Sequence, residues 1–298
     1  MEFNLISDLR VVLAETPIWD ARIKKWYWTD LFKGTVHRFD PITNIDESVE
    51  TGSVIGSAIP CDDADKLLVA VDDGMMLLDF KIGKMELVAS PQTNDGKYRY
   101  NDTRCDSVGR IFTSSVSKSF TEPDFDPNTM TGKFYMIEPG GEVIVLVDKL
   151  VQYNTIFLDN ANKNLYAVDT YYKKLLRFDY SLEKGAFGVP ETVIEFEDMP
   201  DGVSVDVEDN IYVCHWSEKR HITVWNLKDY QFVKSIPFPV KNICCGGFGG
   251  EDMKDFYVGT SLFWLPEGDS DFSTGAGGIF KSRVEIPGKP ENFYKINK

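Results

Sequence analysis

The sequence lacks the features that mark membrane and secreted proteins. It contains no run of about eighteen apolar residues, the length that a membrane helix requires. The N-terminal stretch MEFNLISDLRVVL has no basic stretch ahead of its short apolar run and no small-residue cleavage site, so it does not resemble a secretory signal. We therefore expect a cytoplasmic protein without a membrane partner.

Positive charge is scarce relative to negative charge. The 298 residues include 32 Lys and Arg against 47 Asp and Glu, a formal net charge of −15. The acidic residues are scattered along the chain, and such a surface repels phosphate backbones and anionic lipids. Nucleic acid is therefore not an expected partner, whereas a divalent cation would suit this charge.

Paired cysteines and the motifs of common hydrolases are also missing. The five cysteines are odd in number and follow no CxxC or zinc-ligand spacing, so buried free thiols are predicted and a redox or zinc role is a second alternative. The sequence has no HExxH and no GxSxG, which argues against zincin and α/β-hydrolase chemistry.

The stretch CCGGFGG at 244–250 lacks the Gly-Lys-Ser/Thr of a phosphate-binding loop, and we interpret it as a tight turn between repeats. The three histidines are His37, His215 and His221; His215 either faces a pocket or is packed and hydrogen-bonded.

One pattern recurs six times along the chain. A turn rich in Asp, Asn, Gly or Lys precedes an apolar strand, a polar break and a second strand of alternating pattern. The copies begin at Lys24, Asp65, Gly109, Lys163, Asp209 and Lys254, with spacings of 41, 44, 54, 46 and 45 residues. This period is typical of a four-stranded propeller blade once two less regular outer strands are added. The pattern predicts an all-β, six-bladed β-propeller that forms a single domain over residues 1–298; two β-sandwiches are the alternative.

A propeller must close its ring, because an open last blade would expose an unpaired strand edge. We expect residues 3–13 to pair into the final blade beside the C-terminal stretch NFYKINK. Closure brings the inner strands of all blades together at the axis, so distant positions in the sequence become neighbours.

Polar residues interrupt the repeats at four places, each in a segment that leads into an expected inner strand. They are AETP with Glu15, YRYNDTRCD with Arg99, Asn101 and Asp102, VQYNTIFLD with Asn154, and DMPDGVSVD with Asp201. Their carboxylate and amide oxygens are hard donors, which suit calcium, magnesium or manganese. Each residue also has a plainer interpretation: a strand-end charge for Glu15, loop hydrogen bonding for Asn154, a turn for Asp201-Gly202, and a surface ion pair for Arg99.

These stretches carry a resemblance to a known family. AETPIWD with WYWTDL, YRYNDTRCDSVGRIFTSS, YNTIFLDNANKNLYAVDT, and MPDGVSVDVEDNIYVCHW followed by CCGGFGGEDMKDFYVGTS occur in the order and spacing of that family. The chain is similar along nearly its whole length to the regucalcin, SMP-30, gluconolactonase and luciferin-regenerating enzyme family, whose fold is a six-bladed propeller.

The resemblance implies a site and an activity. Glu15, Asn154 and Asp201 look like the family's three protein ligands of one divalent metal ion, calcium first, with zinc, manganese and magnesium as alternatives. Asn101 and Arg99 resemble residues that contact the substrate, and Asp201 would also act as the catalytic acid and base. The implied function is a metal-dependent lactonase, a carboxylic ester hydrolase that opens sugar lactones.

The chain departs from the family pattern at a few positions. Thr155 follows Asn154 where Gly is common, Thr103 replaces a usual Gly, and VSKS, with Ser119, stands where some members carry acidic residues. These changes bear on the substrate more than on the metal. We expect residues 115–133 and 260–278 to shape the substrate pocket, with Trp216 or Trp264 at its mouth.

Two other function classes stay open. The same metal site could serve an esterase or phosphotriesterase, because a cation also polarises a phosphoryl oxygen. A non-catalytic propeller that binds a small molecule around a structural cation is the third possibility.

Overall fold

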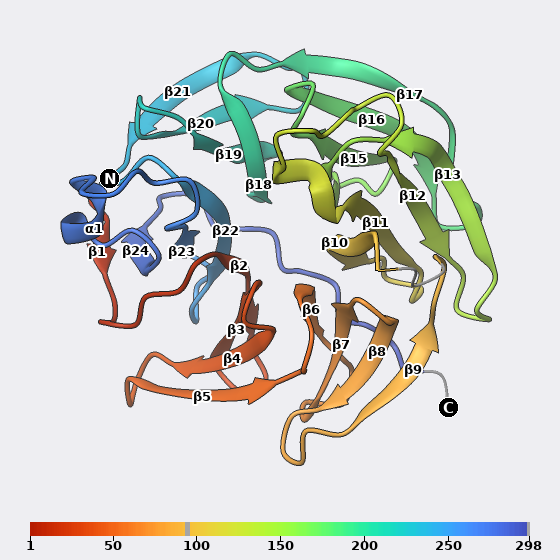
Figure 1. Cartoon of the computed structure of the whole chain (residues 1–298), viewed down its shortest axis with the longest axis horizontal. Helices are drawn as coiled ribbons and strands as arrows, with labels where there is room; N and C mark the ends of the chain where they lie inside the picture. The colour runs from red at the N-terminus through yellow and green to blue at the C-terminus, as the bar shows by residue number, and fades with distance from the viewer. Residues whose placement is uncertain (93–95, 297–298) are drawn as a thin grey trace.

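Six four-stranded sheets surround a central axis. The computed structural model describes residues 1–92 and 96–296, and in this part the strands form six sheets arranged as the blades of a propeller (Figure 1). In each of the first five blades the chain passes in order from the innermost to the outermost strand (Figure 1). The predicted all-β, six-bladed β-propeller is confirmed.

The strands of the first three blades are short and similar in length. Blade one contains β2 (Ala14–Asp20), β3 (Lys25–Asp30), β4 (Thr35–Asp40) and β5 (Ile45–Glu50). Blade two contains β6 (Ile55–Pro60), β7 (Lys66–Val71), β8 (Gly74–Asp79) and β9 (Met85–Ala89). Blade three contains β10 (Tyr98–Cys105), β11 (Ile111–Ser117), β12 (Gly132–Ile137) and β13 (Val143–Leu150), with the 3₁₀ helix η1 (Lys118–Thr121) in the insertion between β11 and β12.

The last three blades repeat this arrangement. Blade four contains β14 (Tyr153–Leu158), β15 (Asn164–Asp169), β16 (Lys174–Ser181) and β17 (Gly185–Glu195). Blade five contains β18 (Met199–Val205), β19 (Asn210–Trp216), β20 (His221–Asn226) and β21 (Phe232–Pro237). Blade six contains β22 (Ile243–Gly249), β23 (Asp255–Thr260), β24 (Ile279–Arg283) and β1 (Asn4–Leu5), with helix α1 (Asp271–Thr274) between β23 and β24. None of the helices in the described residues is long and apolar enough to cross a membrane.

The six sequence repeats correspond to the second and third strands of the blades. The copy that begins at Lys24, for example, forms β3 and β4. The expectation that both remaining strands are outer strands was wrong, because one of them is the innermost strand of each blade. Innermost strands are enclosed on both faces, so they lack the alternation of apolar and polar residues that reveals a strand in sequence. All six residues of β6 and of β14, for instance, are buried.

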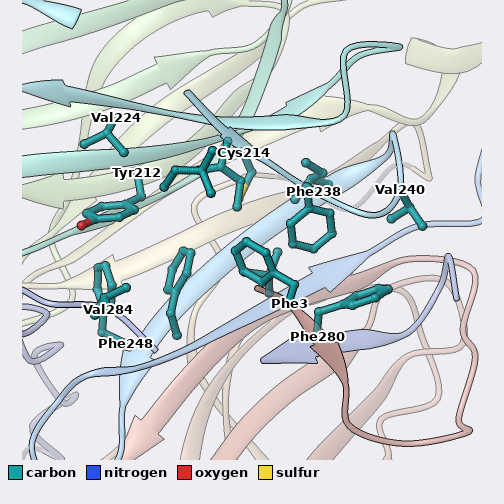
Figure 2. Packing of buried hydrophobic residues seen from close by; sticks show 14 of the residues in the cluster. Phe3, Tyr212, Cys214, Val224, Phe238, Val240, Phe248, Phe280 and Val284 are labelled. Atoms are coloured by element: carbon teal, nitrogen blue, oxygen red, sulfur yellow. The ribbon is translucent and has the colours of Figure 1, made fainter. Parts of the chain in front are cut away.

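The N-terminal segment closes the ring as predicted, but over a shorter length. β1 pairs antiparallel with β24 through Asn4 and Leu5 and so supplies the outermost strand of blade six. Phe3, directly before it, packs in the cluster of Figure 2 against Phe238, at 4.5 Å between ring centroids. Burying an aromatic side chain is among the larger single contributions to stability, so this contact holds the closure in place.

The C-terminal stretch does not join the final blade. After β24 the chain crosses the end of the ring opposite the site described below, where Lys289 N donates to Val205 O at 2.8 Å. Tyr294 then forms an isolated bridge with Cys61 in blade two. The expected pairing of NFYKINK beside β1 was therefore wrong, and residues 297–298 of this stretch lie outside the described residues. β1 already occupies the available edge of β24, so the last residues find partners elsewhere.

The glycine-rich stretch CCGGFGG is a strand and not a turn. It forms most of β22, the innermost strand of blade six. A side chain at Gly247 would place its Cβ 2.0 Å from the backbone oxygen of Pro17 in the neighbouring β2. The glycines therefore permit close approach of inner strands, which the sequence alone did not distinguish from turn chemistry.

Candidate active site

Each inner strand has a β-bulge near its start, at the end of the ring where the candidate site lies. The register of every inner strand shifts by one or more residues against its neighbour at this point, as between Glu15 and Ile18 in β2 and between Pro200 and Val203 in β18. Thr16, in the first of these bulges, has a φ of 47°, which is unusual for a β-branched residue. Bulges redirect side chains, and here they collect polar groups from several blades in one pocket. The candidate residues thus lie within the inner strands and not before them as expected.

Two carboxylates from blades one and five meet in this pocket. Glu15, Asp201 and the thiol of Cys244 from blade six have their possible ligand atoms within 4.8 Å of one another. Asp201 Oδ2 accepts a hydrogen bond of 2.8 Å from Trp216 Nε1, and the Cys245 thiol hydrogen-bonds the Glu15 carboxylate. Asp201 and Gly202 lie within the register shift between Pro200 and Val203, so they form a bulge of β18 and not a turn. A Cβ on Gly202 would come within 2.3 Å of Cys245 Cβ, so glycine is needed for this close approach.

Burial disfavours negative charge on both carboxylates. It raises the pKa of Glu15 to about 7, with repulsion from Asp102 adding to this and the Cys245 hydrogen bond opposing it. Burial, followed by repulsion from Glu15, raises the pKa of Asp201 well above its usual range. Two buried carboxylates this close together are costly unless a cation compensates them.

The amide residues form a hydrogen-bonded row beside the carboxylates. Asn154 Nδ2 donates to Thr170 Oγ1 at 2.7 Å, and this directs Asn154 Oδ1 toward Asn101 Nδ2, which donates to it at 2.6 Å. Arg99 Nη1 in turn donates to Asn101 Oδ1 at 2.7 Å. Burial lowers the pKa of Arg99 to about 10, and attraction to Glu15 opposes that shift. Arg99 therefore brings a positive charge to the same pocket.

The pocket is polar at its floor and largely apolar at its walls. It encloses about 530 Å³ of space, including its open mouth, and all five predicted site residues line it. The insertions 115–133 and 260–278 contribute as expected, through Phe120 and Thr121 and through Phe263 and Trp264. Trp216 and Trp264 both lie at the pocket, as predicted. The remaining lining residues are Leu13, Leu31, Phe32, Gln152, Thr170 and Met199.

The donor set suits a divalent cation. Glu15 and Asp201 supply carboxylate oxygens, and Asn154 supplies an amide oxygen that Thr170 already orients. Oxygen donors of this kind bind calcium, magnesium or manganese, and a nearby thiol also suits zinc. The residues present therefore fit the predicted metal ion, and the buried carboxylate pair is the feature that calls for it.

Two residues of the predicted stretches do not join the site, and one residue was missed. Asp102 turns to a buried ion pair with Arg104. His215 is buried and hydrogen-bonds Thr223 Oγ1 through Nε2 at 2.7 Å, so the packed alternative is confirmed. Cys244 was predicted only as a buried free thiol, which it is, yet it lies beside both carboxylates. Its place in the inner strand of blade six, equivalent to Glu15 in blade one, would have been the signal.

The departures from the family pattern have structural roles. Thr155 occupies the bulge of β14, and its Oγ1 accepts a hydrogen bond of 3.0 Å from Val203 N in the next blade. Thr103 shares a hydrogen bond of 2.8 Å with Thr113 in the neighbouring strand. Ser119 lies in η1, where its carbonyl accepts from Glu122 N at 2.8 Å. The two threonines therefore fasten inner strands where the family commonly has glycine.

Comparison with known proteins gives a consistent result. Residues 13–262 match the family described as the SMP-30/Gluconolactonase/LRE-like region. The chain is 26% identical over 302 residues to the pentonolactonase XacC of Haloferax volcanii, and the match covers 98% of this chain and 97% of that protein.

Solved structures share the fold. A luciferin-regenerating enzyme superposes with a TM-score of 0.90 at 18% identity, covering 99% of both chains. A protein described as a calcium-binding regucalcin from Agrobacterium tumefaciens superposes with a TM-score of 0.88 at 21% identity, covering 98% of this chain and 97% of the other. At these identities the two structures support the architecture alone.

Proposed function

The chain belongs to the SMP-30/gluconolactonase/LRE-like family, and on this premise we propose that it is a divalent-metal-dependent hydrolase that opens lactones, with sugar lactones as the first class to test. The observation that carries the proposal is the convergence of Glu15 and Asp201 in one buried pocket. A cation bound here would compensate the negative charge that burial otherwise disfavours on both carboxylates. We also propose that the six blades work as one domain.

Glu15, Asn154 and Asp201 would hold the cation, calcium being the first expectation. When bound, the ion supplies Lewis acidity that polarises a lactone carbonyl and acidifies water. Asn101 and Arg99, linked to each other and to Asn154, would orient the substrate beside it. The positive charge of Arg99 also favours the oxyanion that develops as the carbonyl is attacked.

Asp201 is the proposed acid and base. Trp216 fixes its Oδ2, which leaves Oδ1 to take a proton from the attacking water. The water oxygen bonds to the carbonyl carbon, the ring carbon–oxygen bond breaks, and the proton on Asp201 passes to the departing ring oxygen. The product is a hydroxy acid.

The proposal is tested with the purified protein and a panel of aldonolactones, dihydrocoumarin and aryl esters, with proton release as the readout. We expect lactone opening that a chelator removes and that calcium, zinc, manganese or magnesium restores. Glu15→Gln and Asn154→Ala should lower the metal content of the protein, measured by elemental analysis, while Asp229→Asn on the exposed surface should not.

The alternatives give different results in the same experiment. Turnover of esters without turnover of lactones would support an esterase, and metal binding without turnover would support a ligand-binding propeller. If the Glu15 and Asn154 variants bind metal as the parent does, the proposed site is misplaced.

A further inference from the structure

We propose that the pocket selects lactones that carry an aromatic or other bulky apolar substituent, which packs against a wall of four rings. This aromatic wall consists of Phe32, Trp216, Phe263 and Trp264. The inference rests on the proposed function for the reaction, but its basis is the lining of the pocket and not the metal ligands.

The aromatic wall is continuous across three neighbouring blades. Phe32 follows β3 in blade one, Trp216 ends β19 in blade five, and Phe263 and Trp264 follow β23 in blade six (Figure 1). Ring centroids are 5.2 Å apart between Phe32 and Phe263, 4.9 Å between Phe263 and Trp264, and 5.5 Å between Trp264 and Trp216. Leu13 and Leu31 pack in one cluster with Trp216 and Phe263, and Met199 pairs with Trp216 across the strands, so these apolar side chains extend the wall.

Three polar groups of Trp216 and Phe263 in this wall already have partners. Trp216 Nε1 donates to Asp201, while Phe263 N donates to Ser261 Oγ at 2.8 Å. Phe263 O accepts from Asn242 Nδ2 at 2.7 Å. A sugar hydroxyl placed against the faces of these rings would give up water without gaining a partner there, which lowers affinity about tenfold for each hydroxyl. An apolar substituent would gain from the same desolvation.

Trp264 is held in this wall at a conformational cost. Its backbone φ is 61°, in the left-handed region that bulky residues rarely adopt, and its side chain is 52% exposed. Burial in the core therefore does not explain the strain. Strained residues that line a pocket are often positioned for a ligand, and the exposed face of this ring has room to receive one.

The lining contributed next to blade four includes a polar atom without a partner in the described part of the chain. Gln152 Oε1 is buried there and has no hydrogen-bond partner among the described residues. It could accept one hydrogen bond from a substrate hydroxyl or amide. The pocket therefore suits a substrate with one apolar side toward blades five, six and one, and a single donor toward blade four.

The test compares γ-phenyl-γ-butyrolactone with unsubstituted γ-butyrolactone and with ribono-1,4-lactone, all of which contain the same five-membered ring. We expect kcat/KM for the phenyl compound to exceed that of the other two at least tenfold. Trp264→Ala should reduce the advantage over the unsubstituted ring to less than threefold, and Trp264→Phe should preserve most of it. Phe187→Ala, which removes an exposed ring on β17 outside the pocket, is the control and should keep the full advantage.

A tenfold preference for ribono-1,4-lactone would overturn the inference, as would an equal loss with all three lactones in Trp264→Ala. If no lactone is opened, the proposed function fails, and calorimetry with the phenyl lactam 5-phenyl-2-pyrrolidinone and with 2-pyrrolidinone decides the inference separately. Tighter binding of the phenyl lactam that depends on Trp264 would support the aromatic wall. Equal binding of the two lactams would overturn it.

Discussion

A carboxylate is buried at each end of the inner strand β18, and the two carboxylates differ in the number of their hydrogen-bond donors. β18 begins near Asp201 and is followed directly by Asp206, and both side chains are buried. Asp206 accepts hydrogen bonds from Glu208 N at 2.8 Å, Asn210 N at 2.9 Å and Asn210 Nδ2 at 2.8 Å. Asp201 has Trp216 as its donor among the described residues, and Glu15 repels it.

Asp106, at the corresponding end of β10, is satisfied in the same way as Asp206. Asp106, which follows this strand, accepts from the backbone N–H groups of Val108, Gly109 and Arg110, and its second oxygen accepts from Tyr180 at 2.8 Å. Asp106 and Asp206, where β10 and β18 end, accept hydrogen bonds from the N–H groups of the turns that follow these strands. Glu15 and Asp201, at the other end, have few donors and lie close together, so they are suited to binding a ligand from outside the chain. Burial of a carboxylate is thus no guide to function until its partners are counted.

The largest expected effect comes from Asp201→Asn. This change should lower kcat/KM for lactone opening at least about a thousandfold, because it removes both a proposed proton acceptor and a metal ligand. The folded structure should remain, as judged by circular dichroism and thermal unfolding. If the variant keeps activity within tenfold of the parent, Asp201 has no catalytic role, and the functional difference between Asp201 and Asp206 does not hold.

Asp206→Ala should have the opposite profile. It leaves two backbone N–H groups and the Asn210 amide without their acceptor, so the free energy of unfolding should fall by about 4 kcal/mol. Urea denaturation of the metal-free protein measures this. In the same assay Asp201→Asn should be neutral or stabilising, because it removes a carboxyl group whose charged form is disfavoured by burial and by Glu15. A larger loss for Asp201→Asn than for Asp206→Ala would contradict this view of the two ends.

His215 is a buried basic group, and its charged form is disfavoured by burial in the same way as the charged forms of the buried carboxylates. Burial lowers its pKa to about 4 from 6.5, so the unfolded chain binds a proton more readily than the folded one between these values. Stability contributed by the neutral ring is therefore complete above pH 6.5 and is lost as the pH falls toward 4, by up to about 3 kcal/mol. His215→Gln should show a shallower decline over this window in denaturation measured at several pH values. An unchanged slope would show that other groups dominate.

The smallest predicted effect concerns Thr155. Thr155→Val keeps the shape of the side chain but leaves Val203 N without its acceptor, so we expect a loss of about 1 kcal/mol in unfolding free energy. Lactone turnover should change less than twofold, because this hydroxyl faces the next blade. A selective loss of turnover would mean that the bulge of β14 positions Asn154 through this bond.

Much of the fold could be predicted because every blade repeats a turn, an apolar strand, a polar break and a strand of alternating pattern. β3 and β4, like their counterparts in the other blades, gave a countable repeat. The innermost strands could not be recognised in this way, since burial on both faces removes alternation. For that reason CCGGFGG was interpreted as a turn although it forms most of β22, and the site residues were placed before the inner strands and not within them.

The candidate site was predicted unevenly for a related reason. Glu15, Asn154 and Asp201 stood out because polar residues interrupt apolar sequence. Cys244 did not, because a cysteine in an apolar strand looks like core. The aromatic wall was foreseen only as two tryptophans, since its continuity depends on where the insertion after β23 folds back.

The sequence by itself determined the number of blades and the acidic, oxygen-rich chemistry of the polar positions, because both follow from residue types at regular spacing. The tertiary structure decided which of those positions meet. Ring closure through Phe3 and β1 and the bulges of the inner strands bring Glu15 and Asp201 together. Those contacts depend on backbone geometry at the axis, and no local pattern in the sequence encodes it.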